Sequence, residues 1–152
     1  PWPGELDTWY RLTSTPPGRA LLVPLAAAFV PEGYVRSATE SVFAPDPVPP
    51  GYIDHFGPMM ALRRGALSSN VVQVNALRDQ LVAMKADYPE VTLPVELIHG
   101  DADTIVPLDI HSRPLSRILP DVTLTVIPGA GHMPHQTHSD AVIAAIARAA
   151  LR

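Results

Sequence analysis

Two stretches decide the fold: Pro94-Val-Glu-Leu-Ile-His-Gly-Asp-Ala-Asp-Thr-Ile-Val-Pro107 and Val122-Thr-Leu-Thr-Val-Ile-Pro-Gly-Ala-Gly-His-Met-Pro-His135. Each begins with a short apolar run, followed by a glycine turn and then by a titratable side chain, Asp103 or His132. The separation of the two runs suits neighbouring parallel strands joined by a helix. Because an open α/β sheet binds ligands outside the carboxyl ends of its strands, we expect the acid and the histidine to point to one place.

Both stretches carry motifs of a known family. Gly100-Asp-Ala-Asp-Thr-Ile-Val-Pro107 resembles the acid loop of the α/β-hydrolase superfamily, in which a Gly, an Asp three residues later and a Pro four residues after that recur. Pro128-Gly-Ala-Gly-His-Met133 resembles its histidine loop. The resemblance implies that Asp103 is the acid and His132 the general base of a triad, in the chain order nucleophile, acid, histidine. The nucleophile would be Ser, Asp or Cys.

The family's nucleophile elbow, Gly-x-Ser-x-Gly, is absent from the 152 residues, and no His-Gly oxyanion motif precedes the first apolar run. Only two convincing strands are present, whereas the resemblance implies eight. We therefore predict an α/β fold that is the C-terminal half of an α/β hydrolase. The N-terminal half, in a second chain or cleaved away, would carry the nucleophile and the oxyanion hole, and the isolated chain would be inactive.

Three regions are expected along the chain. Residues 1–14 lead in from the core, residues 15–87 form a helical lid, and residues 88–152 form the C-terminal part of the core. Proline-broken helices are predicted over 19–30 and 32–43, with a Pro-rich loop at 46–51 and short turns after it. A longer helix should follow, capped by Ser68 or Ser69. Its buried stripe would contain Val71, Val74, Leu77, Leu81 and Met84.

Two more helices are expected in the core region. One should cross over through 108–119 and break at Pro114, with Ser112 capping the second half. The last helix follows a Thr137-x-x-Asp140 capping box. Its buried stripe would contain Val142, Ile143, Ile146 and Ala150.

Composition excludes several classes of protein. A net charge of −4, a pI near 5.8 and the lack of a basic run argue against nucleic acid as a partner. Zero Cys excludes disulfides and thiolate metal sites. The longest apolar run, 20–30, is too short to span a bilayer. We expect no cofactor and no metal; the compartment is open, with the cytoplasm as our default.

The chemistry assigned to the two candidates is that of a triad. A neutral imidazole takes the proton of the nucleophile or of water, and a carboxylate on its other nitrogen fixes the tautomer. The alternative is structural: His132 bound to a backbone carbonyl in the core, and Asp103 capping a turn or helix. We expect Asp101 to be a solvated residue or a partner of a neighbouring turn, and His99 to be structural rather than catalytic.

The apolar lid predicts a mainly apolar small-molecule substrate. The residues predicted to contact it are Trp9, Phe56, Met59, Met60, Ile105 and Met133. Ester hydrolysis with a Ser nucleophile is the main prediction. An epoxide hydrolase or haloalkane dehalogenase with an Asp nucleophile, and a non-catalytic interaction module, are alternatives. A zinc site built from His132, His135 and His138 with Asp101 or Asp103 is a further alternative.

Overall fold

The computed structural model describes residues 8–151, so half of the predicted lead-in segment, residues 1–7, lies outside the described range. The chain divides into two compact units. The strand unit contains residues 40–50 and 84–151, and the helical unit contains residues 8–39 and 51–83. Residues 40–50 thus belong to the strand unit, although the predicted lid included them. The boundaries of the lid remain a prediction.

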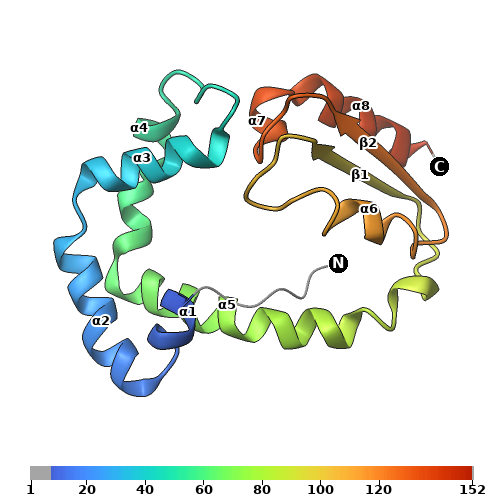
Figure 1. The fold of residues 1–152 in the computed structure, drawn as a ribbon. Coiled ribbons are helices and arrows are strands. Elements are labelled where there is room, and N and C mark those ends of the chain that lie inside the picture. The colour runs from blue at the N-terminus through green and yellow to red at the C-terminus, as the bar shows by residue number, and fades with distance from the viewer. Residues whose placement is uncertain (1–7, 152) are drawn as a thin grey trace. The chain divides into compact units, whose positions relative to one another are not determined.

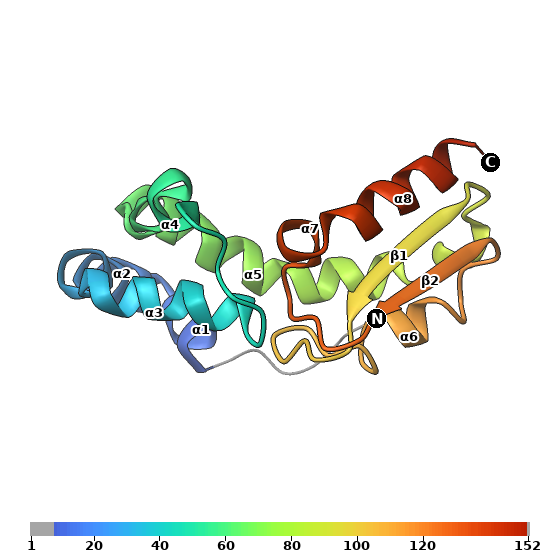
Figure 2. The same cartoon turned by 90° about the horizontal axis from the view of Figure 1, so that it is seen from above.

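The strand unit is built on the two predicted strands. β1 (Val95–Gly100) and β2 (Val122–Ile127) pair in parallel, in a register that runs from Val95 opposite Val122 to Gly100 opposite Ile127. The short helices α6 (Ser112–Leu115) and α7 (Pro134–Thr137) and the longer α8 (Ser139–Ala150) accompany them. α6 and α8 lie on opposite faces of the strand pair (Figures 1 and 2). This arrangement confirms the predicted α/β class.

The crossover between the strands is less helical than predicted. A turn in which the N–H groups of Ile110 and His111 both donate to the Pro107 carbonyl precedes α6. Helix α6 then begins at Ser112, so Pro114 falls in the first turn, where helices tolerate a missing N–H. The crossover is therefore split before Ser112 and not at Pro114, where the break was predicted. The predicted Ser112 cap is wrong, because its hydroxyl contacts the His99 ring.

The final helix buries a different face from the predicted one. Ala145 is buried against the strand pair, whereas Ile143 and Ile146 are more than 60% exposed, at 62% and 63%. The helix is apolar on most sides, so its periodicity did not identify the inner face. The capping box is also wrong: Thr137 ends α7, and its hydroxyl donates to the Met133 carbonyl.

A salt bridge attaches α8 to the strands. Arg148 donates to both carboxylate oxygens of Glu96 on β1, at 2.7 and 3.3 Å, and contacts the Thr125 hydroxyl on β2. The hydrogen bond that Arg148 donates to Glu96 raises the pKa of Arg148. The Glu96 side chain is largely buried, and a buried carboxylate needs such a partner.

Helices make up the helical unit and its extensions. The elements are α1 (Thr8–Thr13), α2 (Pro16–Phe29), α3 (Glu32–Phe43), α4 (Tyr52–Phe56), a 3₁₀ helix over Pro58–Leu62 and α5 (Arg64–Met84). A second 3₁₀ helix, Tyr88–Glu90, leads to β1. Thr15 caps α2 by accepting the N–H of Gly18 at 3.2 Å. Both helices predicted over 19–30 and 32–43 are confirmed.

Helix α5 begins earlier and buries less than predicted. It starts at Arg64, because the Arg63 carbonyl already accepts the N–H of Leu67, so Ser68 and Ser69 lie inside the helix and do not cap it. Within the predicted stripe Val71 is fully buried, but Leu77 and Met84 are 41% and 50% exposed. Of the predicted stripe, only the first residue, Val71, is fully buried.

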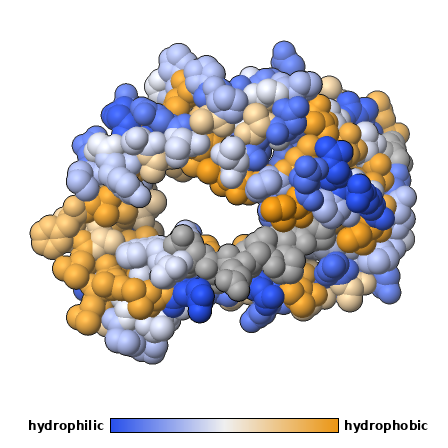
Figure 3. All heavy atoms as spheres, viewed as in Figure 1, coloured by the Kyte–Doolittle hydropathy of each residue, from blue (hydrophilic) through white to orange (hydrophobic). Residues whose placement is uncertain are grey.

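Apolar side chains also lie on the surface of α2. Leu21, Leu25 and Phe29 follow one another at helical spacing and are exposed, and Figure 3 shows apolar residues gathered over this helix. Within residues 8–151 no helix combines the length and the hydropathy that crossing a membrane requires.

The core includes Phe43, the last residue of α3, which is 1% exposed. We predict that Phe43→Ala lowers the free energy of unfolding by roughly 3–5 kcal/mol, because it leaves a cavity. Phe29→Ala is the matched control, since Phe29 is 75% exposed at the end of α2. Denaturant unfolding measures both; equal effects of the two substitutions would contradict this packing.

Candidate active site

Asp103 lies just beyond β1, and its side chain is almost fully buried. Its Oδ1 accepts the N–H groups of Ile105 and Val106, at 2.9 and 2.8 Å. These two bonds form a tight turn of the kind that Asp favours. The other oxygen, Oδ2, is thereby left to face a different partner.

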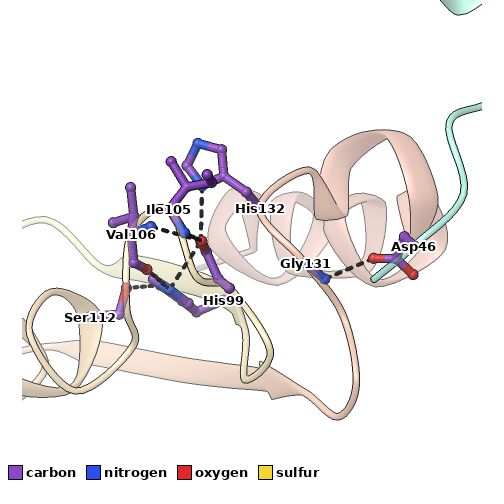
Figure 4. Close-up of polar contacts among 8 residues, drawn as sticks. Asp46, His99, Ile105, Val106, Ser112, Gly131 and His132 are labelled. Atoms are coloured by element: carbon purple, nitrogen blue, oxygen red, sulfur yellow. Dashed lines mark hydrogen bonds and ion pairs between the residues drawn. The ribbon is translucent and has the colours of Figure 1, made fainter. Parts of the chain in front are cut away.

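That partner is His132, which follows β2. Its Nδ1 lies 2.9 Å from Asp103 Oδ2 (Figure 4). Because an ionised carboxylate only accepts hydrogen bonds, Nδ1 carries the proton, and in the neutral ring the lone pair is then on Nε2. The His132 side chain is 31% exposed, and its Nε2 has no hydrogen-bond partner among residues 8–151. An oriented imidazole with one accessible basic nitrogen can accept a proton.

A second histidine supports the acid loop. His99 is buried at the end of β1, and its Nε2 donates to the Val106 carbonyl at 2.7 Å. Since Nε2 carries the proton, Nδ1 of the neutral ring accepts the Ser112 hydroxyl, at 2.6 Å. Nε2 also lies 3.5 Å from Asp103 Oδ2. These contacts stabilise the turn whose N–H groups position Asp103. This is the structural role that we expected for His99.

His111 is half-buried beside this network. Burial lowers its pKa, and the nearby His99 acts in the same direction, while Asp103 raises it. A lowered pKa keeps His111 neutral at neutral pH.

Backbone contacts join the acid and histidine loops. Asp101 donates its N–H to the Ile127 carbonyl, and its carboxylate accepts the N–H of Gly129 at 2.6 Å. Ala102 donates its N–H to the Ala130 carbonyl at 3.1 Å. Asp101 therefore bonds to the neighbouring turn, which is one of its two expected roles.

Gly100 is needed where the two loops meet. A Cβ atom there would lie 2.5 Å from the Ala130 carbonyl carbon and 2.6 Å from the Gly131 oxygen. Carbon atoms in contact lie about 3.5–4.0 Å apart. The glycine of the acid-loop motif thus permits the close approach that brings Asp103 to His132.

Four of the predicted site residues lie in the strand unit: Asp103, His132, Ile105 and Met133. Ile105 is 49% exposed two residues after Asp103, and Met133 is half-buried next to His132. The other four, Trp9, Phe56, Met59 and Met60, lie in the helical unit.

Within the helical unit, Phe56 stacks on Tyr52 with ring centroids 5.3 Å apart, and Met59 lines a cavity of about 200 Å³ together with Ile53 and Val35. Phe56 and Met60 are more than half exposed, and Trp9 is 37% exposed.

The zinc alternative requires three ligands at one point. Within the described range no three His, Asp or Glu side chains are grouped for a metal ion. His132 is bonded to Asp103, and His138 Nδ1 lies 2.9 Å from the Thr137 hydroxyl. The three histidines therefore do not form the predicted zinc site.

One residue at the site was missed by the sequence reasoning. Asp46, in the loop after α3, accepts the N–H of Gly131 through Oδ2 at 2.8 Å. The same oxygen lies 3.3 Å from the Thr137 hydroxyl. An Asp between prolines has the pattern of an ordinary loop residue, and no sequence signal links it to a glycine 85 positions later.

Comparison with known proteins identifies the family. The profile described as "Alpha/beta hydrolase family" matches residues 2–145. The chain belongs to the alpha/beta hydrolase family. The predicted superfamily and fold are thereby confirmed.

Several relatives match parts of this chain. A protein of Synechocystis sp. with the provisional name non-heme chloroperoxidase is 37% identical over 62 residues, which is 41% of this chain and 22% of that protein. The structure of 2-hydroxy-6-oxo-6-phenylhexa-2,4-dienoate hydrolase from Rhodococcus sp. strain RHA1 has a TM-score of 0.69 and 24% identity, over 90% of this chain and 50% of that one. A bacterial membrane phospholipase A matches with a TM-score of 0.53 and 18% identity, over 83% of this chain and 40% of that one. The chain thus spans half or less of each of these relatives.

The junction of the two loops gives a testable prediction. We predict that Gly100→Ala destabilises the strand unit by roughly 1–3 kcal/mol or more, because the new methyl group must push apart two backbone segments. Gly65→Ala, in α5 with open space where the new methyl group would lie, should leave stability unchanged or raise it slightly. Thermal unfolding of the two variants measures the difference; a Gly100→Ala protein as stable as the parent would contradict the close approach.

Proposed function

We propose that this chain supplies the acid and the general base of a hydrolase that cleaves carboxylic esters of mainly apolar small molecules. The observation that supports this most is the 2.9 Å contact between His132 Nδ1 and Asp103 Oδ2, with the His132 ring partly exposed. It is the geometry by which a carboxylate fixes the tautomer of a catalytic imidazole. If both residues had only structural roles, His132 would not need an accessible Nε2. The exposure of its side chain therefore favours the catalytic interpretation.

In the proposed reaction the His132 Nε2 accepts the proton of a serine hydroxyl as the serine oxygen attacks the ester carbonyl. The tetrahedral intermediate collapses, His132 gives its proton to the departing alcohol, and an acyl-enzyme forms. A water molecule then attacks the acyl group while His132 accepts its proton. The acid product leaves, and the proton returns to the serine. Asp103 stabilises the imidazolium in both steps.

The serine and the oxyanion donors are proposed to lie in an N-terminal half of the protein, in the same chain or in another. Three features support this. The chain contains Asp103 and His132 in the family's order but no elbow motif before them, and it covers only half of the Rhodococcus hydrolase. Parallel strands also need neighbours and cover on both faces, whereas every residue of β2 remains partly exposed. The chain alone is therefore proposed to be inactive.

The substrate is proposed to contact the apolar side chains that flank the catalytic pair, Ile105 and Met133. Both are accessible, and both adjoin the residues that would carry the reaction. Trp9, Phe56, Met59 and Met60 are proposed to form the apolar lining supplied by the lid, residues 15–87 with their lead-in. An apolar lining with a few polar groups is typical of small-molecule pockets.

His132→Ala should abolish nearly all turnover of the protein that includes the N-terminal half, and Asp103→Asn should lower kcat by about 10⁴-fold. An asparagine cannot stabilise the imidazolium and favours the wrong tautomer. Hydrolysis of p-nitrophenyl esters of different acyl length measures both effects. The matched controls are His135→Ala and Asp109→Asn, because both residues are exposed and neither bonds to His132 or Asp103. Parental rates in both test variants would refute the proposal.

The identity of the nucleophile separates the two enzymatic alternatives. An Asp nucleophile would form an ester with an epoxide or a haloalkane, and water would attack the enzyme's own carboxyl group. In a single turnover in H₂¹⁸O we expect the heavy oxygen in the acid product and not in the protein, because a serine acyl-enzyme takes the water oxygen into the substrate. Label in an aspartate of the enzyme would instead establish epoxide hydrolase or dehalogenase chemistry. No incorporation with any substrate would favour the interaction module.

A further inference from the structure

We infer that Asp46 is a positioning residue for His132, and this inference rests on the function proposed above. Asp46 lies in the loop after α3, and its carboxylate Oδ2 accepts the N–H of Gly131, the residue directly before His132, at 2.8 Å (Figure 4). Hydrogen bonds to an ionised acceptor are roughly twice as strong as neutral ones. The carboxylate therefore acts on the peptide group next to the proposed general base.

Gly131 explains why such a contact is needed. A Cβ atom on this residue would lie 2.6 Å from the Phe43 carbonyl oxygen and closer still to that of Ala44. The histidine loop therefore packs directly against the backbone that leads to Asp46, and no side chain fits between them. Glycine meets this requirement, but it is also the residue with the most backbone freedom. The required glycine thus gives the backbone directly before His132 a freedom that a hydrogen bond can restrict.

The histidine loop is held from two sides. The Ala130 carbonyl accepts the N–H of Ala102 in the acid loop, and the Gly131 N–H donates to Asp46. The first bond fixes the loop to the acid loop, and the second fixes it to the segment after α3. The Thr137 hydroxyl, 3.3 Å from the same Asp46 oxygen, adds a weaker contact at the end of α7. Loss of the Asp46 carboxylate removes the hydrogen bond to the Gly131 N–H. The His132 ring can then move out of hydrogen-bonding alignment with Asp103.

The expected kinetic effect is on kcat rather than on KM. A displacement of about 1 Å in a reacting group lowers a rate by about 10²-fold. In the protein with its N-terminal half, we expect Asp46→Ala to lower kcat by about 10- to 100-fold with little change in KM. Asp46→Asn keeps an oxygen that accepts the Gly131 N–H, so its kcat should stay within several-fold of the parent. Asp79→Ala, on the exposed face of α5, is the control and should match the parent.

A second measurement tests the contact without turnover. Amide hydrogen exchange followed by NMR should show faster exchange at Gly131 in Asp46→Ala, with little change in Asp46→Asn and in Asp79→Ala. The imidazole resonances of His132 should shift or broaden in the Ala variant alone. A merely structural role would change the unfolding temperature without selectively moving these signals.

The outcomes separate this inference from the function on which it rests. If His132→Ala retains turnover, the proposed function fails. If His132→Ala abolishes turnover while Asp46→Ala keeps the parental kcat or the parental exchange at Gly131, only the inference is overturned. An Asp46→Asn variant as slow as Asp46→Ala overturns it too, because the accepting oxygen would then not be what matters. Should the Ala variant fail to fold, exchange at Gly131 in the parent decides: a protected amide supports the contact with Asp46, and an amide that exchanges as fast as one in an open loop overturns the inference.

Discussion

The parallel pairing of β1 and β2 is the constraint on which the site depends. The last register pair, Gly100 opposite Ile127, ends both strands at the same edge of the sheet. Three residues beyond one strand and five beyond the other, the chain carries a carboxylate and an imidazole. A shift of the register by one residue would change the inward side chains of a whole strand and separate the loops. The 2.9 Å contact between Asp103 and His132 is therefore a consequence of strand pairing.

At this edge of the sheet the two loops must pack closely, which requires glycine, and they must also be rigid, which glycine opposes. Glycines at 100 and 131 let the loops approach each other and the segment after α3 more closely than any side chain would allow. Glycines also free the backbone, and hydrogen bonds around the pair offset this freedom. His99 holds the acid loop through the Val106 carbonyl, Asp101 holds Gly129, and Asp46 holds Gly131. Two of these supports come from residues 99–101 and the third from the loop after α3, so distant parts of the strand unit together fix the pair.

Several apolar surfaces of this chain are exposed. Ile143 and Ile146 on α8, and the row Leu21, Leu25 and Phe29 on α2, are exposed. The chain matches the family profile over residues 2–145 but spans half of the Rhodococcus hydrolase. Exposed apolar helix faces and a sheet of two strands agree with a fold that the proposed N-terminal half completes, since large exposed apolar patches are rare on monomeric proteins.

The sequence by itself determined the two strands, their parallel direction and the pair Asp103 and His132, because these depend on short apolar runs and on local glycine and proline spacing. Tertiary structure alone decided which face of α8 is buried, how short α6 is and which residue accepts the Gly131 amide. An apolar helix offers several possible inner faces, and packing against β1 selects one. Asp46 and Gly131 lie 85 positions apart, and only the folded backbone brings a carboxylate to that N–H.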